Sequence, residues 1–457
     1  MEPQKSIISI NGHIRQKTYS SILQILNSVI SDKRYADILI TKLFKNEDFS
    51  SSEKAAVVEH VYGILRHRAR IDHIIENGST AVISSLGLNI LNVLRICTYQ
   101  AVFKELKAAA VITNSIALSA KDARLSGFVK RTVEAILKNK DNVIFPDRQQ
   151  APLDYISTYH SHPLWVVEKW AGELHRVEEV EALCQANNLV PPLTIRVNPL
   201  KTDRNSLKAS LEKNGYATSP SPFSHFGLIV YKKEDIFKTE AFGRGDFEVQ
   251  DEGSQLITLL TAAKKGEFII DACAGNGGKT LFLSGLMKNK GVIVACDAYP
   301  AKFLDLRRRA NKSGASNIKT VEITGLADYG GKADCVFIDA PCSGMGVFRR
   351  NPDSKWRLGK GDILELSLKQ KEILRQYSIL VKPGGRLVYA TCTISLEENE
   401  DVVLGFLDEN KEFYLVSPLE TDPGVFAEFV ADDGFFRSMP HIHNTDGFFG
   451  AVMMRKK

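Results

Sequence analysis

The sequence predicts a three-part protein of the α/β class, with an all-helical domain at residues 1–145, a small α+β module at 153–245 and a doubly wound α/β domain at 246–457. Two patterns predict this division. Before about residue 140, apolar residues recur three and four positions apart, which is the period of an amphipathic helix. After Gly253, short apolar strands alternate with helical stretches, which is typical of a parallel sheet with helices on both faces. A chain of 457 residues is long enough for two or three domains.

The helical part is expected to be a bundle of about six or seven helices, interrupted at Gly78, Gly87 and Gly127. Residues 141–152 hold two prolines among polar residues and predict a linker. The clearest apolar stripes of the helical part consist of Tyr19, Ile22, Leu23, Ile25, Leu26, Val29 and Ile30, and of Leu91, Leu94, Ile96, Tyr99, Val102 and Phe103.

The module after the linker mixes helices and strands. A helical stretch over 164–187 precedes the strand Leu193–Val197, and a helix over 205–214 precedes the strand Gly227–Tyr231. This order predicts a small α+β fold of the RNA-recognition-like kind.

Charge and cysteine content narrow the class of protein. Residues 1–150 carry 21 Lys and Arg against 14 Asp and Glu, so the positive excess lies in the helical part and indicates a polyanionic partner. The seven cysteines form no CxxC pair, which argues against the disulfide framework of a secreted protein and against a zinc site. No apolar run approaches the roughly 18 residues of a membrane span, and the first residues hold no apolar signal core. We therefore expect a cytoplasmic monomer without a metal or a membrane partner.

The first two predicted strands of the α/β domain end in residues suited to a nucleoside. The strand Phe268–Asp271 runs into a turn with three glycines, where the backbone can approach a ligand closely before a helix begins. Thr280 stands where the dinucleotide fingerprint needs its third glycine, and Cys273 stands where a Walker loop needs its first. Asp297 ends the second strand, and a carboxylate there commonly accepts hydrogen bonds from both ribose hydroxyls. The alternatives are a tight turn without a ligand and a helix cap at Asp297.

A cysteine follows each of two further predicted strands. Cys342 comes three residues after the strand 335–339, and Cys392 comes directly after the strand 386–391. Fifty positions separate the two cysteines, which is about one crossover with its helix, so we expect neighbouring strands and one shared pocket. Two thiols beside a nucleoside pocket favour a thiolate that adds to an electron-poor ring. The alternative for each cysteine is a small buried apolar residue.

A basic segment lies between the two cysteines. Its candidates for RNA contact are Arg349, Arg350, Lys355 and Trp356, because cations contact phosphates and an indole ring stacks on an unpaired base. The alternative is a solvated surface loop.

Four motifs together resemble the signature set of the RNA cytosine-5 methyltransferases, which use S-adenosylmethionine. They are DACAGNGGKT, DAPCSG, RRNPDSKW and ATCTISLEENE. In the helical part, VYGILRHRARID and ILNVLRICTYQAVF resemble the NusB-like RNA-binding domain of the RsmB (Sun) branch, which methylates 16S ribosomal RNA of the small subunit. The resemblance extends to YHSHPLWVVEKW, TIRVN, FEVQDEGSQ and TDGFFGAVMMRKK, so it covers nearly the whole chain. It implies a Rossmann-like S-adenosylmethionine-dependent methyltransferase domain at the C-terminal end.

The resemblance also implies a role for each motif residue. Cys392 would be the nucleophile that adds to carbon 6 of the cytosine, and Cys342 would assist loss of the carbon 5 proton and release of Cys392. Asp339 would hydrogen-bond the base. The cofactor would be held by Cys273, Ala274, Gly275, Asn276, Gly277, Gly278, Lys279, Asp297 and Asp339. DNA cytosine-5 methyltransferases attack with the cysteine of their PC motif, so DAPCSG by itself leaves open which cysteine attacks.

The chain departs from the family pattern at two places near the cofactor. Asn276 replaces the usual proline of the glycine turn, and residues 322–325 lack the usual aspartate, for which Asp328 could substitute. Neither departure touches the cysteines or Asp339, so we expect an active enzyme. Two alternatives are the same chemistry on transfer RNA and a non-catalytic RNA-binding assembly factor.

Overall fold

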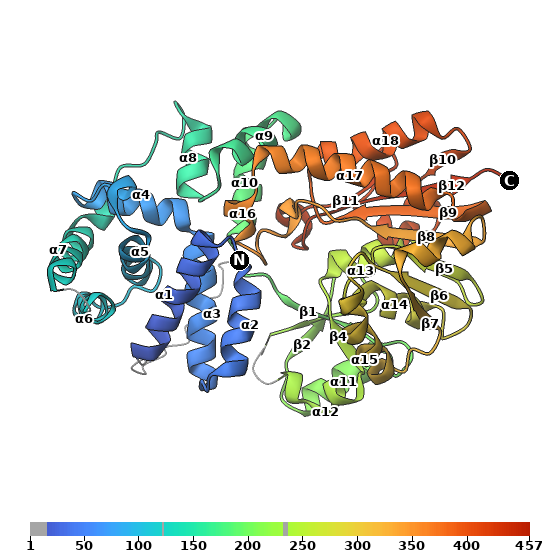
Figure 1. Ribbon diagram of the computed structural model, residues 1–457, viewed down its shortest axis with the longest axis horizontal. Helices are drawn as coiled ribbons and strands as arrows, with labels where there is room; N and C mark the ends of the chain where they lie inside the picture. The colour runs from blue at the N-terminus through green and yellow to red at the C-terminus, as the bar shows by residue number, and fades with distance from the viewer. Residues whose placement is uncertain (1–15, 121–122, 232–235) are drawn as a thin grey trace. The chain divides into compact units, whose positions relative to one another are not determined.

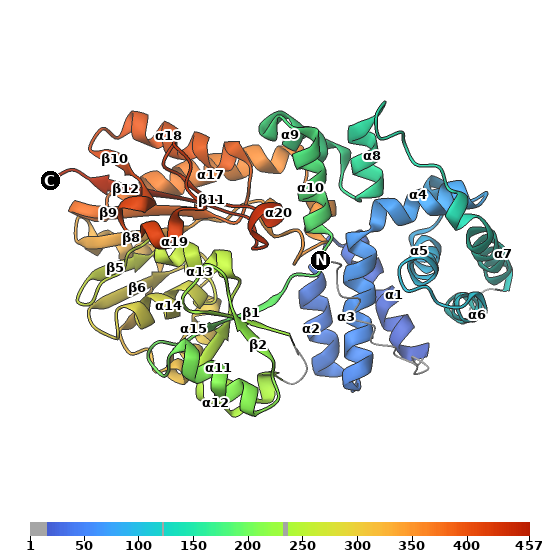
Figure 2. The ribbon, with the colours of Figure 1, turned by 180° about the vertical axis from the view of Figure 1, so that it is seen from behind.

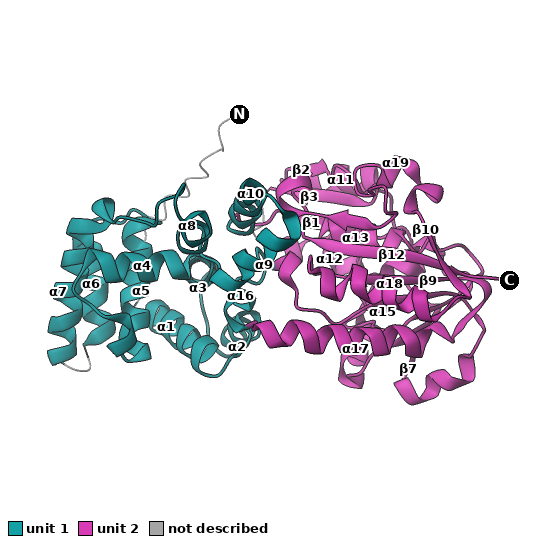
Figure 3. Cartoon of the chain, turned by 90° about the horizontal axis from the view of Figure 1, so that it is seen from above, with its two compact units in different colours: residues 1–188, 348–357 teal, residues 189–347, 358–457 magenta. Residues whose placement is uncertain are grey.

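The computed structural model describes residues 16–120, 123–231 and 236–457, which form two compact units (Figure 3). The helical unit contains the described residues up to Asn188 together with Phe348–Arg357. The sheet unit contains the described residues of 189–347 and 358–457. Within the described ranges, no helix has both the length and the apolar character needed to cross a lipid bilayer.

The helical unit buries its apolar stripes in one core, which confirms the predicted helical domain. Ile22, Leu26 and Leu94 are fully buried there, and both predicted stripes contribute to the core. The bounds of the helices are α1 (Gln16–Ser31), α2 (Ala36–Asn46), α3 (Ser51–Arg66), α4 (Arg68–Gly78), α5 (Leu88–Val102), α6 (Ala108–Ser119), α7 (Ala123–Asn139), α8 (Pro152–Tyr159), α9 (Leu164–Leu174), α10 (Val177–Asn187) and α16 (Ser354–Arg357).

Local signals explain several of these helix ends. α3 begins with a capping box, in which the Ser50 hydroxyl accepts the Glu53 N–H and the Glu53 carboxylate accepts the Ser50 N–H. Gly78 ends α4 and Gly87 precedes α5, as predicted. Gly127 lies inside α7, so the predicted interruption there is wrong.

The stretch 164–187, predicted as one helix, forms two helices. α9 ends at Leu174, and the next residue, His175, has a left-handed backbone φ of 56° that turns the chain before α10. α8, α9 and α10 group with the helical unit by their contacts. The sheet of the α+β module begins only at β1 (Leu193–Val197).

Two histidines of the helical unit are held in the neutral form. Burial lowers the pKa of His67 to about 3, and nearby cations, led by Lys355, act in the same direction. Burial and Lys355 also lower the pKa of His162 well below its usual value. A histidine in an unfolded chain has a pKa of about 6.5, so below that pH the unfolded chain binds more protons than the folded chain. The stability of the unit must therefore fall as the pH drops from 6.5 toward the low folded pKa values.

We expect each of these two histidines to remove ~2 kcal/mol from the free energy of unfolding between pH 6.5 and pH 5. All three tryptophans, Trp165, Trp170 and Trp356, lie in the helical unit, so urea unfolding followed by tryptophan fluorescence reports this unit. His67→Gln should remove the contribution of His67, ~2 kcal/mol, from the pH-dependent loss. An identical pH dependence in His67→Gln and the natural chain would contradict the prediction.

The sheet unit begins with a small antiparallel sheet. Its strand order is β2 (Thr218–Pro220), β3 (Gly227–Val230), β1 and β4 (Phe247–Val249). The helices α11 (Arg204–Lys213) and α12 (Glu240–Arg244) bury Leu207, Leu211 and Ala241 against it. The alternation of β1 leaves Arg196 on the other face of this sheet, toward the larger sheet.

The larger sheet confirms the predicted doubly wound domain, but it is mixed rather than wholly parallel. Five strands are parallel, in the order β9 (Val381–Thr391), β8 (Ala333–Asp339), β5 (Phe268–Asp271), β6 (Val292–Cys296) and β7 (Ile318–Val321). β12 (Phe448–Arg455) pairs antiparallel with β9, and β10 (Phe413–Val416) and β11 (Phe436–Ser438) pair antiparallel with β12. The strand order reverses between β5 and β8, and such a reversal marks the ligand crevice of an open α/β sheet.

Helices cover both faces of the larger sheet (Figure 1, Figure 2). Ile270 and Ile338 face α17 (Lys360–Ser378) and α18 (Glu400–Glu409), whereas Ile269 and Phe337 face α13 (Glu252–Leu259), α14 (Gly278–Leu286) and α19 (Pro423–Phe426). Adjacent strand residues point to opposite faces, so near-continuous apolar strands fill both cores. The remaining helices are α15 (Phe303–Ser313) and α20 (Pro440–His443).

Candidate active site

The two predicted cysteines lie side by side at the carboxyl ends of neighbouring strands. β8 and β9 pair directly, with Asp339 opposite Ala390. The Sγ atoms of Cys342 and Cys392 are 3.2 Å apart, and the N–H of Cys392 donates to Cys342 Sγ at 3.3 Å. Both side chains are only partly buried. Two sulfur atoms at this distance can share one proton.

The surroundings of Cys342 favour its protonated form. Its hydrogen bond with Cys392 raises the pKa of Cys342 well above its usual value, and burial and the charge of Glu398 act in the same direction. Either sulfur can be the donor of the S–H···S bond.

A buried carboxylate, which the sequence analysis missed, holds the loop that carries Cys342. Glu398 accepts the N–H of Ser343 at 2.9 Å and the Ser343 hydroxyl at 2.5 Å. Gln370 on α17 donates to the same carboxylate and to the carbonyl of Pro341, both at 2.9 Å. Glu398 and Gln370 are fully buried, and the Tyr389 hydroxyl donates to the backbone carbonyl of Glu398. The loop is thus fixed on both sides of Cys342.

An ion pair at the switch point of the sheet joins two further predicted residues. Lys279 Nζ at the start of α14 lies 2.5 Å from Asp339 Oδ2 at the end of β8. Burial lowers the pKa of Lys279, but the charge and hydrogen bond of Asp339 outweigh it and leave the pKa above its usual value. Lys279 is therefore a fixed cation beside the thiol pair.

Asp271, at the end of β5, was not among the predicted site residues. Its Oδ2 accepts the Thr280 hydroxyl at 2.7 Å, whereas its Oδ1 is buried and has no hydrogen-bond partner among the described residues. Burial raises the pKa of Asp271 to about 7, although the Thr280 hydroxyl opposes this. A buried carboxylate oxygen without a donor indicates room for a ligand that brings one.

The glycine turn and Asp297 form one structure. The N–H of Gly275 donates to Asp297 Oδ2 at 2.8 Å, and Asp297 also accepts from the Tyr299 N–H and from Lys302 Nζ. The backbone of Gly275 has φ of +55°, and a Cβ there would meet nothing within 4 Å, so open space lies over the turn. At Gly277, φ is +84° and a Cβ would lie 2.0 Å from Leu306 Cδ1, so only glycine fits.

The outer side of the turn is braced by two arginines. Arg196 of β1 is fully buried and donates to the carbonyl of Gly278 at 2.8 Å. Arg309 of α15 donates to the carbonyl of Asn276 at 2.6 Å and to Glu248 of β4 at 2.9 Å. The small antiparallel sheet therefore supports the turn. At the turn itself, Ala274 is buried in a small core, and burial keeps the Cys273 thiol protonated by raising its pKa well above its usual value.

The predicted RNA-contact segment is largely buried, which argues against the alternative of a solvated surface loop. Arg349 and Lys355 are fully buried within the helical unit, and Lys355 Nζ donates to backbone carbonyls of that unit. Trp356 Nε1 donates to the carbonyl of Leu65 at 2.6 Å. Arg350 is half-buried. Arg349 and Lys355 are thus engaged with the protein, whereas Arg350 and Trp356 keep part of their surface exposed.

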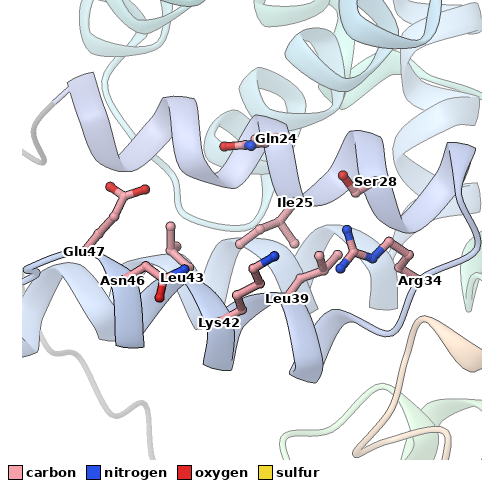
Figure 4. Close-up of a pocket in the computed structure, with 9 residues that line it drawn as sticks. All are labelled: Gln24, Ile25, Ser28, Arg34, Leu39, Lys42, Leu43, Asn46 and Glu47. Atoms are coloured by element: carbon pink, nitrogen blue, oxygen red, sulfur yellow. The ribbon is translucent and has the colours of Figure 1, made fainter.

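A surface hollow of about 170 Å³ lies elsewhere in the helical unit, between α1 and α2 (Figure 4). Its lining residues are Gln24, Ile25, Ser28, Arg34, Leu39, Lys42, Leu43, Asn46 and Glu47. It has cations and amides around an apolar floor and no cysteine. The arrangement able to do covalent chemistry is therefore the one at the strand ends of the sheet unit.

Comparisons with known proteins agree with this architecture. Family models match at residues 16–141 (NusB family), 162–236 (ferredoxin-like domain of RsmF/B-like methyltransferases) and 258–454 (16S rRNA methyltransferase RsmB/F). A Bacillus subtilis protein named "Probable ribosomal RNA small subunit methyltransferase B" is 30% identical over 443 residues, covering 95% of this chain and 98% of its own. A mouse protein named "28S rRNA (cytosine-C(5))-methyltransferase" is 33% identical over 314 residues, covering 64% of this chain and 39% of its own. The crystal structure of PH0851 is 26% identical and covers 97% of this chain and 99% of its own, with a TM-score of 0.77.

The sheet with its paired strand-end thiols, together with these matches, defines the class as RNA cytosine-5 methyltransferases. The chain is an enzyme of this class, which argues against a non-catalytic assembly factor. It belongs to the RsmB/F family of 16S rRNA methyltransferases and carries the NusB domain at its N-terminal end.

Proposed function

We propose that this protein methylates carbon 5 of a cytosine in 16S ribosomal RNA, with S-adenosylmethionine as the methyl donor and Cys392 as a covalent nucleophile. One observation carries the proposal: two sulfur atoms 3.2 Å apart lie at the ends of neighbouring strands, beside a glycine turn and a fixed cation. A single strand-end thiol would support addition to a ring but not the later proton removal.

The first step is addition of the Cys392 sulfur to carbon 6 of the cytosine. The bond that forms joins Sγ to carbon 6, and the electron pair displaced from the ring makes carbon 5 nucleophilic. The Cys342 thiol lies in hydrogen-bond contact with the attacking sulfur. The base must be unpaired or flipped out, since stacked neighbours cover both faces of a paired ring.

Asp339 and Lys279 support the ring during addition. Asp339, whose Oδ2 holds Lys279, has a second carboxylate oxygen that can accept a hydrogen bond from the amino group of the base. Negative charge that builds up on the ring is stabilised by a cation that is already in place. Lys279 would supply this cation, because its ion pair with Asp339 holds it before the substrate arrives.

The last step needs a proton acceptor near carbon 5. The electron pair of the carbon 5–hydrogen bond restores the ring double bond, and Cys392 leaves as a thiolate. We assign proton removal to Cys342, acting with a water molecule. The water molecule accepts the carbon 5 proton, and the Cys342 thiol, which keeps its own proton, donates a hydrogen bond to the departing Cys392 sulfur. Glu398 holds the loop of Cys342 in place for this step.

The residues of the glycine turn fit S-adenosylmethionine. The open space over Gly275 leaves room for the ligand, and the unpartnered Asp271 Oδ1 suits its ammonium group. Asp297 retains acceptor capacity for ribose hydroxyls beside the three donors that it already binds. When bound, this cofactor supplies an electrophilic methyl group on a sulfonium.

The choice of 16S ribosomal RNA rests on the family and on the NusB domain. Transfer RNA is the alternative substrate with the same chemistry. Bisulfite mapping of total RNA with and without the gene decides between them. Loss of one 5-methylcytosine from 16S RNA is expected, and its loss from transfer RNA alone would contradict the proposal.

A further inference from the structure

Hydrogen bonds within the sheet unit join the loop of Cys342 to the loop of Cys392. The Ser343 hydroxyl lies 2.8 Å from the hydroxyl of Thr393, and each of these two residues directly follows one of the cysteines. A second link is the N–H of Gly346, which donates to the carbonyl of Cys392 at 3.0 Å. The spacing of the two thiols is therefore set by direct contacts between their loops.

Glu398 is the acceptor at the end of this hydrogen-bonded chain. Its Oε2 accepts the Ser343 hydroxyl at 2.5 Å, and its Oε1 accepts the N–H of Ser343 and the amide of Gln370, both at 2.9 Å. Because the Ser343 hydroxyl donates its only proton to Glu398, the Thr393 hydroxyl is the donor in the bond between the two loops. The carboxylate thus orients both hydroxyl groups.

The charge of Glu398 has no counter-ion. Its side chain is fully buried, and none of the residues that the structure describes forms an ion pair with it. A buried carboxylate without a cation costs stability, and its field is only weakly screened. A glutamine could make the same contacts, since its oxygen can accept and its amide can donate to the Ser343 hydroxyl. The negative charge is therefore what distinguishes glutamate from glutamine at this position.

Several groups act on the charge state of Cys342. The pKa of Cys342 is raised first by its hydrogen bond with Cys392, then by burial and by the charges of Cys392 and Glu398. The N–H of Gly344, as a hydrogen-bond donor, acts in the opposite direction. The Tyr389 hydroxyl also faces Cys342, but burial raises the pKa of Tyr389 well above its usual value and keeps it neutral. Glu398 therefore supplies a negative charge that disfavours a thiolate at Cys342.

Cys392 faces a charge of the opposite sign. Burial lowers the pKa of Lys279, whereas the ion pair with Asp339 and the nearby Cys392 sulfur raise it, so the Lys279 ammonium group interacts with that sulfur. A cation favours a thiolate, and an anion disfavours one. The thiol pair is thus polarised, with Glu398 on the side of Cys342 and Lys279 on the side of Cys392.

We propose that Glu398 decides which cysteine attacks the base: its charge leaves the attack to Cys392 and keeps Cys342 as the protonated thiol that assists release. Glu398 is a positioning residue, because it is fully buried and acts through Cys342. The inference rests on the proposed covalent mechanism. Without the charge of Glu398, the two thiols become more alike, and Cys342 holds the proton needed for release less firmly.

The test is Glu398→Gln in the full chain, followed by alkylation with iodoacetamide at a series of pH values. Peptide mass spectrometry measures the modification of Cys342 and Cys392 separately. Because the lost charge had disfavoured the Cys342 thiolate, the pH midpoint for alkylation of Cys342 should fall by about one pH unit. Steady-state methyl transfer should fall roughly tenfold or more, because release loses part of the help of a placed proton donor. An unchanged midpoint would overturn the inference.

Glu400→Gln is the matched control. Glu400 is a largely buried acid two positions further along the chain, and it pairs with Arg437 at 2.6 Å. This variant should lower stability but leave the midpoint of Cys342 and the rate of methyl transfer unchanged. An equal fall of the midpoint in the two variants would overturn the inference. If Glu398→Gln does not fold, Gln370→Lys places a cation against the same carboxylate and should also lower the midpoint.

Cys392→Ser separates failure of this inference from failure of the mechanism. If Cys392→Ser still formed RNA adducts, the covalent mechanism would fail, and the role of Glu398 would fall with it. If Cys392→Ser formed no adducts while the alkylation midpoint of Cys342 stayed the same in Glu398→Gln, only the role of Glu398 would be overturned.

Discussion

Replacing Cys392 by serine is expected to lower methyl transfer to RNA by about 10⁴-fold or more and to abolish covalent RNA adducts. A serine hydroxyl is almost fully protonated near neutral pH and is a much weaker nucleophile than a thiolate. The Cys342 thiol, which lies beside this position, cannot restore that reactivity. Single-turnover transfer of labelled methyl groups and denaturing gels of RNA complexes measure the two effects.

Cys342→Ser should give the opposite pattern of adducts. Addition by Cys392 remains possible, but proton removal from carbon 5 and release of Cys392 lose the thiol that assists them, so the methylated adduct accumulates. Cys97→Ala is a suitable control, because Cys97 is a buried thiol in the core of the helical unit. If Cys342→Ser abolished adducts and Cys392→Ser accumulated them, the two roles would be exchanged.

The strand-end residues of the site could be predicted because the rule behind them is local. Parallel strands end at one edge of the sheet, so a short apolar run followed by Asp339 or Cys392 places each residue at that edge. The spacing of the two cysteines was enough to predict neighbouring strands. The antiparallel direction of β10, β11 and β12 could not be predicted, because the pattern of apolar residues does not specify strand direction.

Buried charges could not be predicted in this way. Lys355 sits in a run of cations that is typical of a solvated RNA-binding loop, and its acceptors are supplied by Arg66, Ser161 and Asn188, which no local pattern connects. In the same way, Glu397 is exposed and Glu398 is fully buried, although they are adjacent acids of one motif. The burial of a charge depends on distant partners, whereas the burial of an apolar strand depends on its own composition.

Asp339→Asn is expected to lower the single-turnover rate roughly 10²- to 10³-fold. Asparagine keeps the shape of the side chain but loses the charge that holds Lys279, so the cation is left beside the thiol pair without its counter-charge. The base also loses an acceptor that is fixed before it arrives. Stability should fall as well, by ~2 kcal/mol or more, because breaking a largely buried ion pair leaves one charge uncompensated.

Asp334→Asn separates the loss of rate from the loss of stability. Asp334 lies at the other end of β8, pairs with Lys382 and accepts the Phe268 N–H at 2.7 Å. Like Asp339, it is therefore an aspartate of β8 that forms an ion pair with a lysine. It should lower stability but leave the single-turnover rate within about twofold of the natural chain, because no reacting group lies at that edge of the sheet. An equal loss of rate in the two variants would show that Asp339 acts only through the stability of β8. A selective loss in Asp339→Asn, at equal RNA binding, would assign the carboxylate to the chemistry at the cytosine.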